Sequence, residues 1–209
     1  MLAAGGMIDM DLKNSQTREN LMRAFAGESQ ARNRYTFAAQ AAKSAGLHFI
    51  ERIFRFTAEQ EKEHAEIFMK LLASCEGENI HIDGAYPVEN TAWPTDRLLR
   101  SAQHNEYEEA RSVYPAFAAT APEEGFQAAA AAFEMIARIE QTHGDRFAKL
   151  AQRIEEGKLF LSDEEGERWL CLNCGHVHTG SQVPPVCPVC KHAQGYFVRL
   201  EADEILASF

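Results

Sequence analysis

The chain of 209 residues is poor in several features that would place it in particular classes of protein. It lacks an apolar run long enough to span a bilayer, so we expect no membrane partner. The start, "MLAAGGMIDMDLKN", has no basic residue before its short apolar part, as a signal peptide would have. We therefore expect residues 1–14 to be a loose leader and the protein to be cytoplasmic.

Positive charge is also scarce. The net charge is −10, which gives no general attraction to nucleic acid or to an anionic membrane surface. The G-x-G-x-x-G fingerprint of a dinucleotide-binding turn is absent too. The sequence therefore predicts neither a nucleic-acid partner nor a nicotinamide cofactor bound by this chain.

Cysteine is rare outside one short stretch near the C-terminus. Cys75 stands alone, and two Cys-x-x-Cys pairs supply Cys171, Cys174, Cys187 and Cys190. In a chain without a signal peptide, such pairs indicate a metal site rather than disulfides. Four thiolates form a tetrahedral site for zinc or for iron, so a structural zinc ribbon and an electron-carrying iron site both stay open.

Most of the chain has the composition and apolar spacing of helices. We predict four, over about 15–45, 47–73, 95–120 and 122–156. Gly46 is expected to stop the first, and Pro122, followed by two acidic residues, to begin the last. Pro115 is expected to kink the third helix.

The residue composition changes near residue 167, and short β-like segments, turn residues and the four cysteines follow. The predicted domains are a helical bundle at 15–157, a linker at 158–166 and a small β-rich domain at 167–209. The small domain has too little core to be stable without a metal. The predicted fold class is therefore mainly α, with a small metal-dependent C-terminal domain.

The apolar stripe of each predicted helix carries acidic residues in its middle. The second helix has Glu61 and His64 on the face of Phe54 and Phe68, because spacings of three and four share one face. The other three helices repeat the pattern, with Glu28 on the first, Glu106 and Glu109 on the third, and Glu140 and His143 on the fourth.

Several buried carboxylates are costly, because each loses its hydration and repels the others. Glu28 and Glu61 are 33 residues apart and Glu106 and Glu140 are 34 apart, as in a duplicated helical hairpin. Two glutamates plus two Glu-x-x-His pairs are the ligand set of di-iron carboxylate bundles. A single Glu-x-x-His more often marks a solvated helix face, but six such residues on apolar stripes favour a pair of bound metal ions.

Four stretches resemble the rubrerythrin family: "AFAGESQARNRY" at 24–35, "EQEKEHA" at 59–65, "YPAFAATAPEEGF" at 114–126 and "CLNCG…CPVC" at 171–190. The resemblance covers about residues 15–200. It implies a ferritin-like four-helix bundle with a di-iron site and a rubredoxin-like domain with one more iron, although zinc can occupy either site in a preparation.

The resemblance also implies roles for individual residues. Glu61 and Glu140 would bridge the two irons, Glu28 would bind one, and Glu106 with His143 would bind the other. Glu109 in the oxidised state and His64 in the reduced state would exchange as ligands to the first iron. Tyr35 and Tyr114 would donate hydrogen bonds to the site carboxylates, although an ordinary core role is equally open for Tyr114.

The function implied is reduction of hydrogen peroxide to water. Electrons would arrive through the cysteine-bound iron from a separate NAD(P)H-dependent reductase or a rubredoxin, and a head-to-tail homodimer is implied as well. The alternative is a ferritin-like ferroxidase or iron-handling protein. An attached rubredoxin-like domain argues against the alternative, because iron storage needs no such electron donor.

Overall fold

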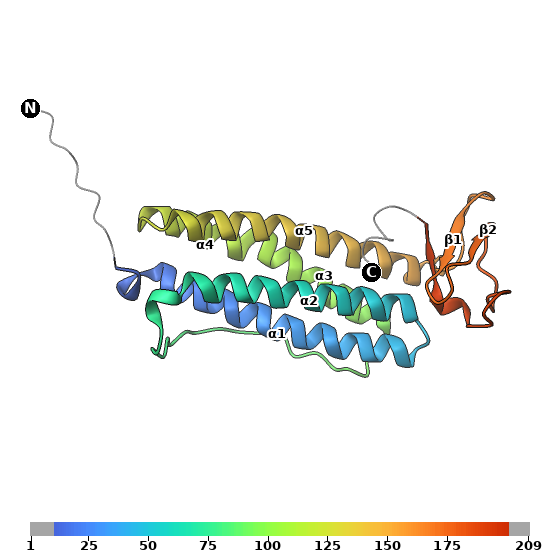
Figure 1. Ribbon diagram of the computed structural model, residues 1–209, viewed down its shortest axis with the longest axis horizontal. Coiled ribbons are helices and arrows are strands. Elements are labelled where there is room, and N and C mark those ends of the chain that lie inside the picture. Colours follow the sequence, from blue (N-terminus) through green and yellow to red (C-terminus); the bar gives the residue numbers. More distant parts are fainter. Residues whose placement is uncertain (1–10, 201–209) are drawn as a thin grey trace, which may run out of the picture. The chain divides into compact units, whose positions relative to one another are not determined.

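The computed structural model describes residues 11–200 of the chain. The helices are α1 (Gln16–Ser44), α2 (His48–Leu71), α3 (Thr95–Glu108), α4 (Tyr114–Glu123) and α5 (Gln127–Glu155), and a π-helical turn (Glu109–Val113) joins α3 to α4. The strands are β1 (Arg168–Cys171), β2 (Val177–Thr179) and β3 (Phe197–Arg199) (Figure 1). The prediction of a mainly α protein with a ferritin-like bundle and a small β region is confirmed.

Two predictions about the ends of elements need correction. Residues 1–10 of the expected leader lie outside the described residues, but Leu12–Asn14 form a short 3-10 helix capped by Asp11. Pro122 does not begin the last helix, because it lies in the final turn of α4. The break follows at Gly125, whose φ of 89° is a left-handed conformation that glycine adopts without strain.

The predicted stop at Gly46 is confirmed. Gly46 has a φ of 74°, and the amides of Gly46 and Leu47 donate to the carbonyls of Lys43 and Ala42 at 2.9 Å each. These two bonds satisfy carbonyls that the end of α1 leaves without an intrahelical partner. The chain can therefore turn within three residues and start α2 at His48.

The described chain divides into two compact units. Of the described residues, the first comprises 11–31, Glu61–Pro87 and His104–Gly144. Its core includes three aromatic rings, with centroids 5.3 Å apart for Phe68 and Phe133 and 5.6 Å for Phe68 and Tyr114. This apolar cluster holds together the helix segments that carry the predicted acidic residues.

The π-helical turn changes which residues of the first unit face the core. A π-turn adds one residue to the helix, so the side chains after it shift in phase. Val113, which lies four residues after Glu109 and would share its face in a regular helix, is 36% exposed, whereas Tyr114 is buried at 1%. The π-helical turn ends two residues before Pro115, and the kink predicted at Pro115 stays a prediction.

The second unit comprises Arg32–Gln60, Val88–Gln103 and Asp145–Phe209. Its helical part packs Phe54 against Phe147, with ring centroids 5.2 Å apart. Its C-terminal part is an antiparallel sheet with the strand order β2-β1-β3, and Trp169 and Phe197 are buried in its core.

The segment 158–166, predicted as a linker, is hydrogen-bonded to the small β region. The carbonyl of Phe160 accepts from the amide of Val183 at 3.0 Å, and the amide of Ser162 donates to Ser181 at 2.7 Å. The Phe160 ring packs on the core around Trp169. The domain boundaries at 157 and 167 stay predictions.

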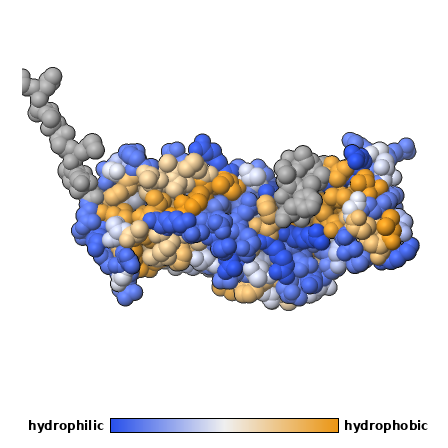
Figure 2. All heavy atoms as spheres, viewed as in Figure 1, coloured by the Kyte–Doolittle hydropathy of each residue, from blue (hydrophilic) through white to orange (hydrophobic). Residues whose placement is uncertain are grey.

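On the face that the space-filling view shows, hydrophilic residues are interspersed with apolar areas (Figure 2). No helix within residues 11–200 is both long and apolar enough to cross a membrane.

Candidate metal centres

Two overlapping groups of buried acids and histidines lie in the first unit. In each, four ligand atoms lie within 4.8 Å of one another. The first group is Glu28, Glu61, His64 and Glu140, and the second is Glu61, Glu106, Glu140 and His143. All six side chains are buried, and Glu61 and Glu140 belong to both groups. This is the arrangement that two adjacent metal ions with two shared carboxylates require.

His64 lies among the carboxylates of the first group. Its Nδ1 is 2.9 Å from Glu140 Oε1, 3.1 Å from Glu61 Oε2 and 3.6 Å from Glu28 Oε2. The i, i+3 spacing on α2 brings Glu61 and His64 to one face, as the sequence predicted.

His143 occupies the matching place in the second group. Its Nδ1 is 2.8 Å from Glu140 Oε2, 3.1 Å from Glu61 Oε1 and 4.0 Å from Glu106 Oε2. The two imidazole rings are nearly parallel, at 20°, with centroids 5.9 Å apart. Each imidazole therefore lies beside one oxygen of Glu61 and one oxygen of Glu140.

The charge state of each carboxylate of the site depends on the positive charge beside it. Burial, followed by the charge of Glu140, raises the pKa of Glu28 well above its usual value. Burial also acts to raise the pKa of Glu61, but the two imidazoles outweigh it and hold this pKa below the usual range. Burial lowers the pKa of His143, yet Glu61 and Glu140 raise it to about 9. The acids therefore depend on positive charge placed between them.

The donor set fits a pair of metal ions. Glu28 Oε2, Glu61 Oε1 and both carboxylate oxygens of Glu140 are buried and accept no well-aligned hydrogen bond. The hydrogen bond of His64 Nδ1 is shared with Glu61 Oε2, at 3.1 Å. A buried carboxylate oxygen without a donor is costly, and a cation at the shared centre removes that cost.

The two tyrosines predicted beside the site lie in different surroundings. The hydroxyl of Tyr114 donates a hydrogen bond to Glu28 Oε1, and both side chains are buried. The Tyr35 ring is buried in the second unit, 6.0 Å from the Phe54 ring and 5.3 Å from the Phe147 ring between centroids. A hydrogen bond from Tyr35 to a site carboxylate stays a prediction.

Glu109 belongs to neither group of four. It is the first residue of the π-helical turn, and its carboxylate lies beside α1: a methyl group placed on Gly27 would be 3.5 Å from Glu109 Oε1. His64, not Glu109, thus completes the first group in this structure. The exchange between Glu109 and His64 stays a prediction.

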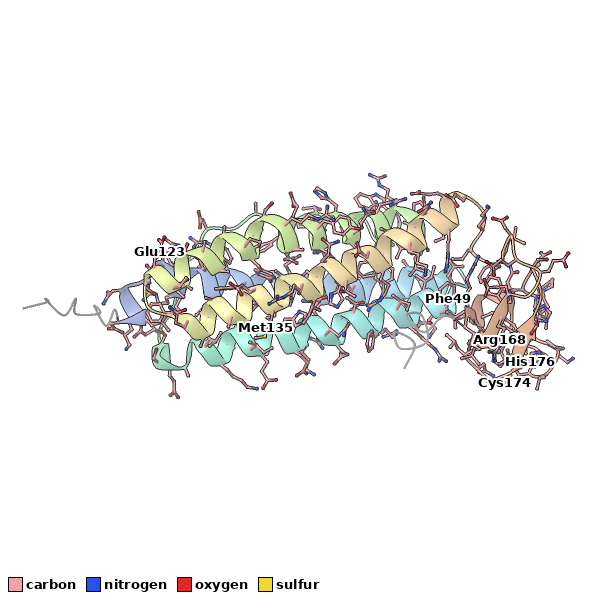
Figure 3. All side chains as sticks on the ribbon, turned by 90° about the horizontal axis from the view of Figure 1, so that it is seen from above. Phe49, Glu123, Met135, Arg168, Cys174 and His176 are labelled. Atoms are coloured by element: carbon pink, nitrogen blue, oxygen red, sulfur yellow. The ribbon has the colours of Figure 1, made fainter. Side chains whose placement is uncertain are left out.

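The four cysteines form a third group, in the second unit. Cys171 Sγ is 3.7 Å from Cys190 Sγ, and Cys174 Sγ is 3.8 Å from Cys187 Sγ. Metal–sulfur bonds of about 2.3 Å in a tetrahedron give an edge of about 3.8 Å, so the thiols are spaced for one four-coordinate ion. Figure 3 shows Cys174 and His176 at the end of the small β region.

The loops around the cysteines are built as a matched pair. The amide of Cys171 donates to the carbonyl of His176, and that of Cys187 to His192, both at 2.8 Å. The amide of His192 also lowers the pKa of Cys190, to about 6, by donating to its sulfur, whereas burial raises the pKa of Cys171 to about 12. Amides directed at sulfur stabilise thiolates, the form that binds metal.

A close approach beside the second group has no signature in the sequence. A methyl group placed on Gly144 would lie 2.5 Å from the ring of Tyr107. Apolar periodicity assigns neither residue to the site, because Gly144 adds nothing to a stripe and Tyr107 lies off it.

The rubrerythrin family profile matches residues 19–151, and the profile of the rubrerythrin rubredoxin-like domain matches residues 169–198. The first match alone spans more than half of the chain. The chain belongs to the rubrerythrin family. A rubrerythrin of Clostridium perfringens is 50% identical over 189 residues, which cover 89% of this chain and 95% of the relative. The rubrerythrin of Nitratidesulfovibrio vulgaris is 44% identical over 188 residues, with the same coverage of both chains.

Solved structures agree with this assignment. The fully reduced, all-ferrous state of nigerythrin matches with a TM-score of 0.60 and 29% identity, over 93% of this chain and 94% of that chain. The glutamate and histidine groups are thus the di-iron carboxylate site of a rubrerythrin, and the four cysteines are its rubredoxin-like site. Rubrerythrins are generally oxidoreductases, which is the broad class of this chain.

Proposed function

We propose that this rubrerythrin is a peroxidase that reduces hydrogen peroxide to water at the carboxylate site. The observation that supports it best is the pair of overlapping ligand groups that share Glu61 and Glu140, on a chain that also carries a one-electron metal site. When bound, two ferrous ions supply the two electrons that, with two protons, convert one H₂O₂ into two waters.

The proposed ligand roles follow the two groups. Glu61 and Glu140, which both groups share, would bridge the two ions, Glu28 would serve the first position, and Glu106 with His143 would serve the second. At the first position, His64 would serve the reduced state and Glu109 would take its place in the oxidised state. An anionic oxygen suits ferric iron and a neutral nitrogen suits ferrous iron, which gives the exchange a chemical basis.

The surrounding side chains prepare the site for this chemistry. The ligands of the two groups are at most 5% exposed, so bulk water is kept from the reacting atoms. The Tyr114 hydroxyl keeps a proton directed at Glu28 Oε1, because burial and then the charge of Glu28 raise the pKa of this phenol well above its usual value. Glu28 is thereby held in one orientation.

The rubredoxin-like site is proposed to return electrons one at a time. These electrons are expected to come from a separate NAD(P)H-dependent reductase or a rubredoxin, because the sequence of this chain has no dinucleotide-binding fingerprint. A head-to-tail homodimer in the cytoplasm is proposed on family resemblance.

Stopped-flow absorbance tests the proposal. Protein loaded with iron alone, with its iron content verified, is reduced without oxygen and mixed with stoichiometric peroxide or with oxygen. A four-thiolate iron is nearly colourless when reduced and red when oxidised. Rapid return of colour with peroxide and slower return with oxygen would support the peroxidase. Equally slow return with both oxidants would contradict it and favour the ferroxidase alternative.

A further inference from the structure

We propose that Gly144 is a positioning residue for the second metal position: it lets the Tyr107 ring lie against α5, and the ring in turn holds the α3 turn that carries Glu106. This inference rests on the proposed function, in which Glu106 and His143 serve that position. The two residues are the chain neighbours of those ligands, one following Glu106 and the other following His143.

The contact between Gly144 and Tyr107 leaves no room for a side chain. A Cβ on Gly144 would lie 2.5 Å from both Cδ1 and Cε1 of Tyr107 and 3.4 Å from Cβ of Glu106. Carbon atoms do not approach to 2.5 Å without bonding, so any larger residue displaces the ring. Gly144 lies in the interior of α5, where glycine is unfavourable for the helix. The Tyr107 ring occupies the space that a side chain on Gly144 would need, which explains why a glycine stands there.

The ring of Tyr107 has a second contact, with Arg111. The guanidinium carbon of Arg111 lies 3.8 Å from the ring centroid, a cation–π contact. Arg111 Nε donates a hydrogen bond to Gln141 Oε1 at 3.0 Å. Gln141 directly follows Glu140 on α5, so these contacts tie α3 and the π-helical turn to the helix that bears Glu140 and His143.

The geometry makes the two metal positions unlike. Beside the first position, Glu109 lies out of the ligand group next to Gly27, and a methyl group there would meet it only at 3.5 Å, an ordinary contact. At the second position, the Tyr107 ring lies so close to Gly144 of α5 that a Cβ there has no room, and the Cβ of Glu106 lies in contact distance as well. The second position is therefore a rigid one, next to a first position whose ligands are proposed to exchange.

Metal binding to the full-length chain tests the inference. The cysteine site is first filled with zinc, and Co²⁺ is then titrated without oxygen while its visible absorption is followed. Gly144→Ala should weaken the second Co²⁺ about 10- to 100-fold, the usual loss when a supporting residue of a metal ligand is changed, with the first Co²⁺ little affected. With one Co²⁺ bound per chain, the visible spectrum of Gly144→Ala should match that of Glu106→Ala and differ from that of Glu28→Ala.

Gly27→Ala is the matched control, because it adds the same methyl group to a helix beside a ligand without the clash. It should bind both Co²⁺ ions within about twofold of the parent. A double variant adds a second readout. If Tyr107 carries the effect, Gly144→Ala together with Tyr107→Ala should bind no more weakly than Tyr107→Ala alone.

Each other outcome overturns the inference. Unchanged affinities with raised thermal stability in Gly144→Ala would show that alanine only improves the helix. Equal weakening of both ions would show a general packing defect, and additive losses would show that the two residues act separately. Failure of the unaltered protein to bind a pair of Co²⁺ ions would instead reject the ligand assignment itself.

Discussion

The hydroxyl of Tyr114 donates a hydrogen bond to Glu28 Oε1, and the two side chains are buried together. Tyr114 follows the π-helical turn directly, so the extra residue in that turn is what directs the phenol into the site. The same residue packs its ring against Phe68. Its hydroxyl and its ring therefore have separable roles.

Tyr114→Phe should remove the hydrogen bond and keep the packing. Glu28 then loses the donor that orients Oε1, and we expect the first metal ion to bind about 10- to 100-fold more weakly, as for other supporting residues of metal ligands. Anaerobic Fe²⁺ dialysis measures the affinity, and circular dichroism checks that the helices are kept. Unchanged affinity would show that the phenol does not position Glu28. Tyr35→Phe, measured in parallel, tests the hydrogen bond predicted for Tyr35.

Replacing Glu61 and replacing Glu109 by alanine should affect iron binding and peroxide turnover differently. Glu61→Ala removes a carboxylate shared by both groups, so both iron positions should lose occupancy. Glu109→Ala removes a side chain outside the groups, so the reduced protein should keep two ferrous ions while peroxide turnover falls by at least about tenfold. Iron analysis and steady-state turnover make the comparison.

The exposed neighbour Glu108 supplies the control for both variants, because Glu108→Ala should bind iron and turn over like the parent. Two irons retained in Glu61→Ala would reject its bridging role. Full turnover in Glu109→Ala would reject its role as an exchanging ligand.

Glu124 should make the stability of the first unit depend on pH. Its carboxylate accepts from the amides of Gln16 at 2.9 Å and Thr17 at 2.8 Å, at the start of α1. Burial raises the pKa of Glu124, but the bonds from Thr17 and Gln16 outweigh it and leave this pKa below its usual value. The stabilisation is then complete above the unfolded-state pKa of about 4.3 and is lost as the pH falls through the lower folded-state pKa.

Glu124→Gln should accordingly lower the free energy of unfolding by about 1 kcal/mol at pH 7, the usual value of a helix cap. The difference from the parent should shrink at pH values below about 4. Denaturant unfolding followed by circular dichroism measures both. Glu123→Gln is the matched control on the exposed neighbour, and a difference that is independent of pH would contradict the proposed cap.

The two cysteine loops should respond differently to changes at corresponding positions. Gly175 follows Cys174 with a φ of 77°, and Lys191 follows Cys190 with a φ of 64°. Left-handed backbone costs a residue with a Cβ about 1–2 kcal/mol, so Gly175→Ala should destabilise the loaded site by about that amount. Lys191→Ala should be nearly neutral, because the lysine already bears this cost. Loss of the iron–thiolate colour in guanidinium compares the two, and equal effects would contradict the argument.

Helical periodicity and cysteine spacing predicted much of the fold and of the site. A period of 3.6 residues fixes which side chains share a helix face, so Glu61 and His64, or Glu140 and His143, had to face the same way. Charged residues on an apolar helix face need compensating charge in any fold, and this requirement by itself indicates bound metal. In the same way, the spacing of two Cys-x-x-Cys pairs by itself predicts a tetrahedral four-thiolate metal site.

Tertiary structure alone decided the remaining features. The π-helical turn moved Val113 outward and Tyr114 inward, a phase shift that no regular period contains. Which of His64 and Glu109 completes the first group depends on the side chains that meet across helices. The space at Gly144 is defined by the Tyr107 ring, which comes from another helix. Sequence patterns describe one element at a time, and these features arise only where elements are packed together.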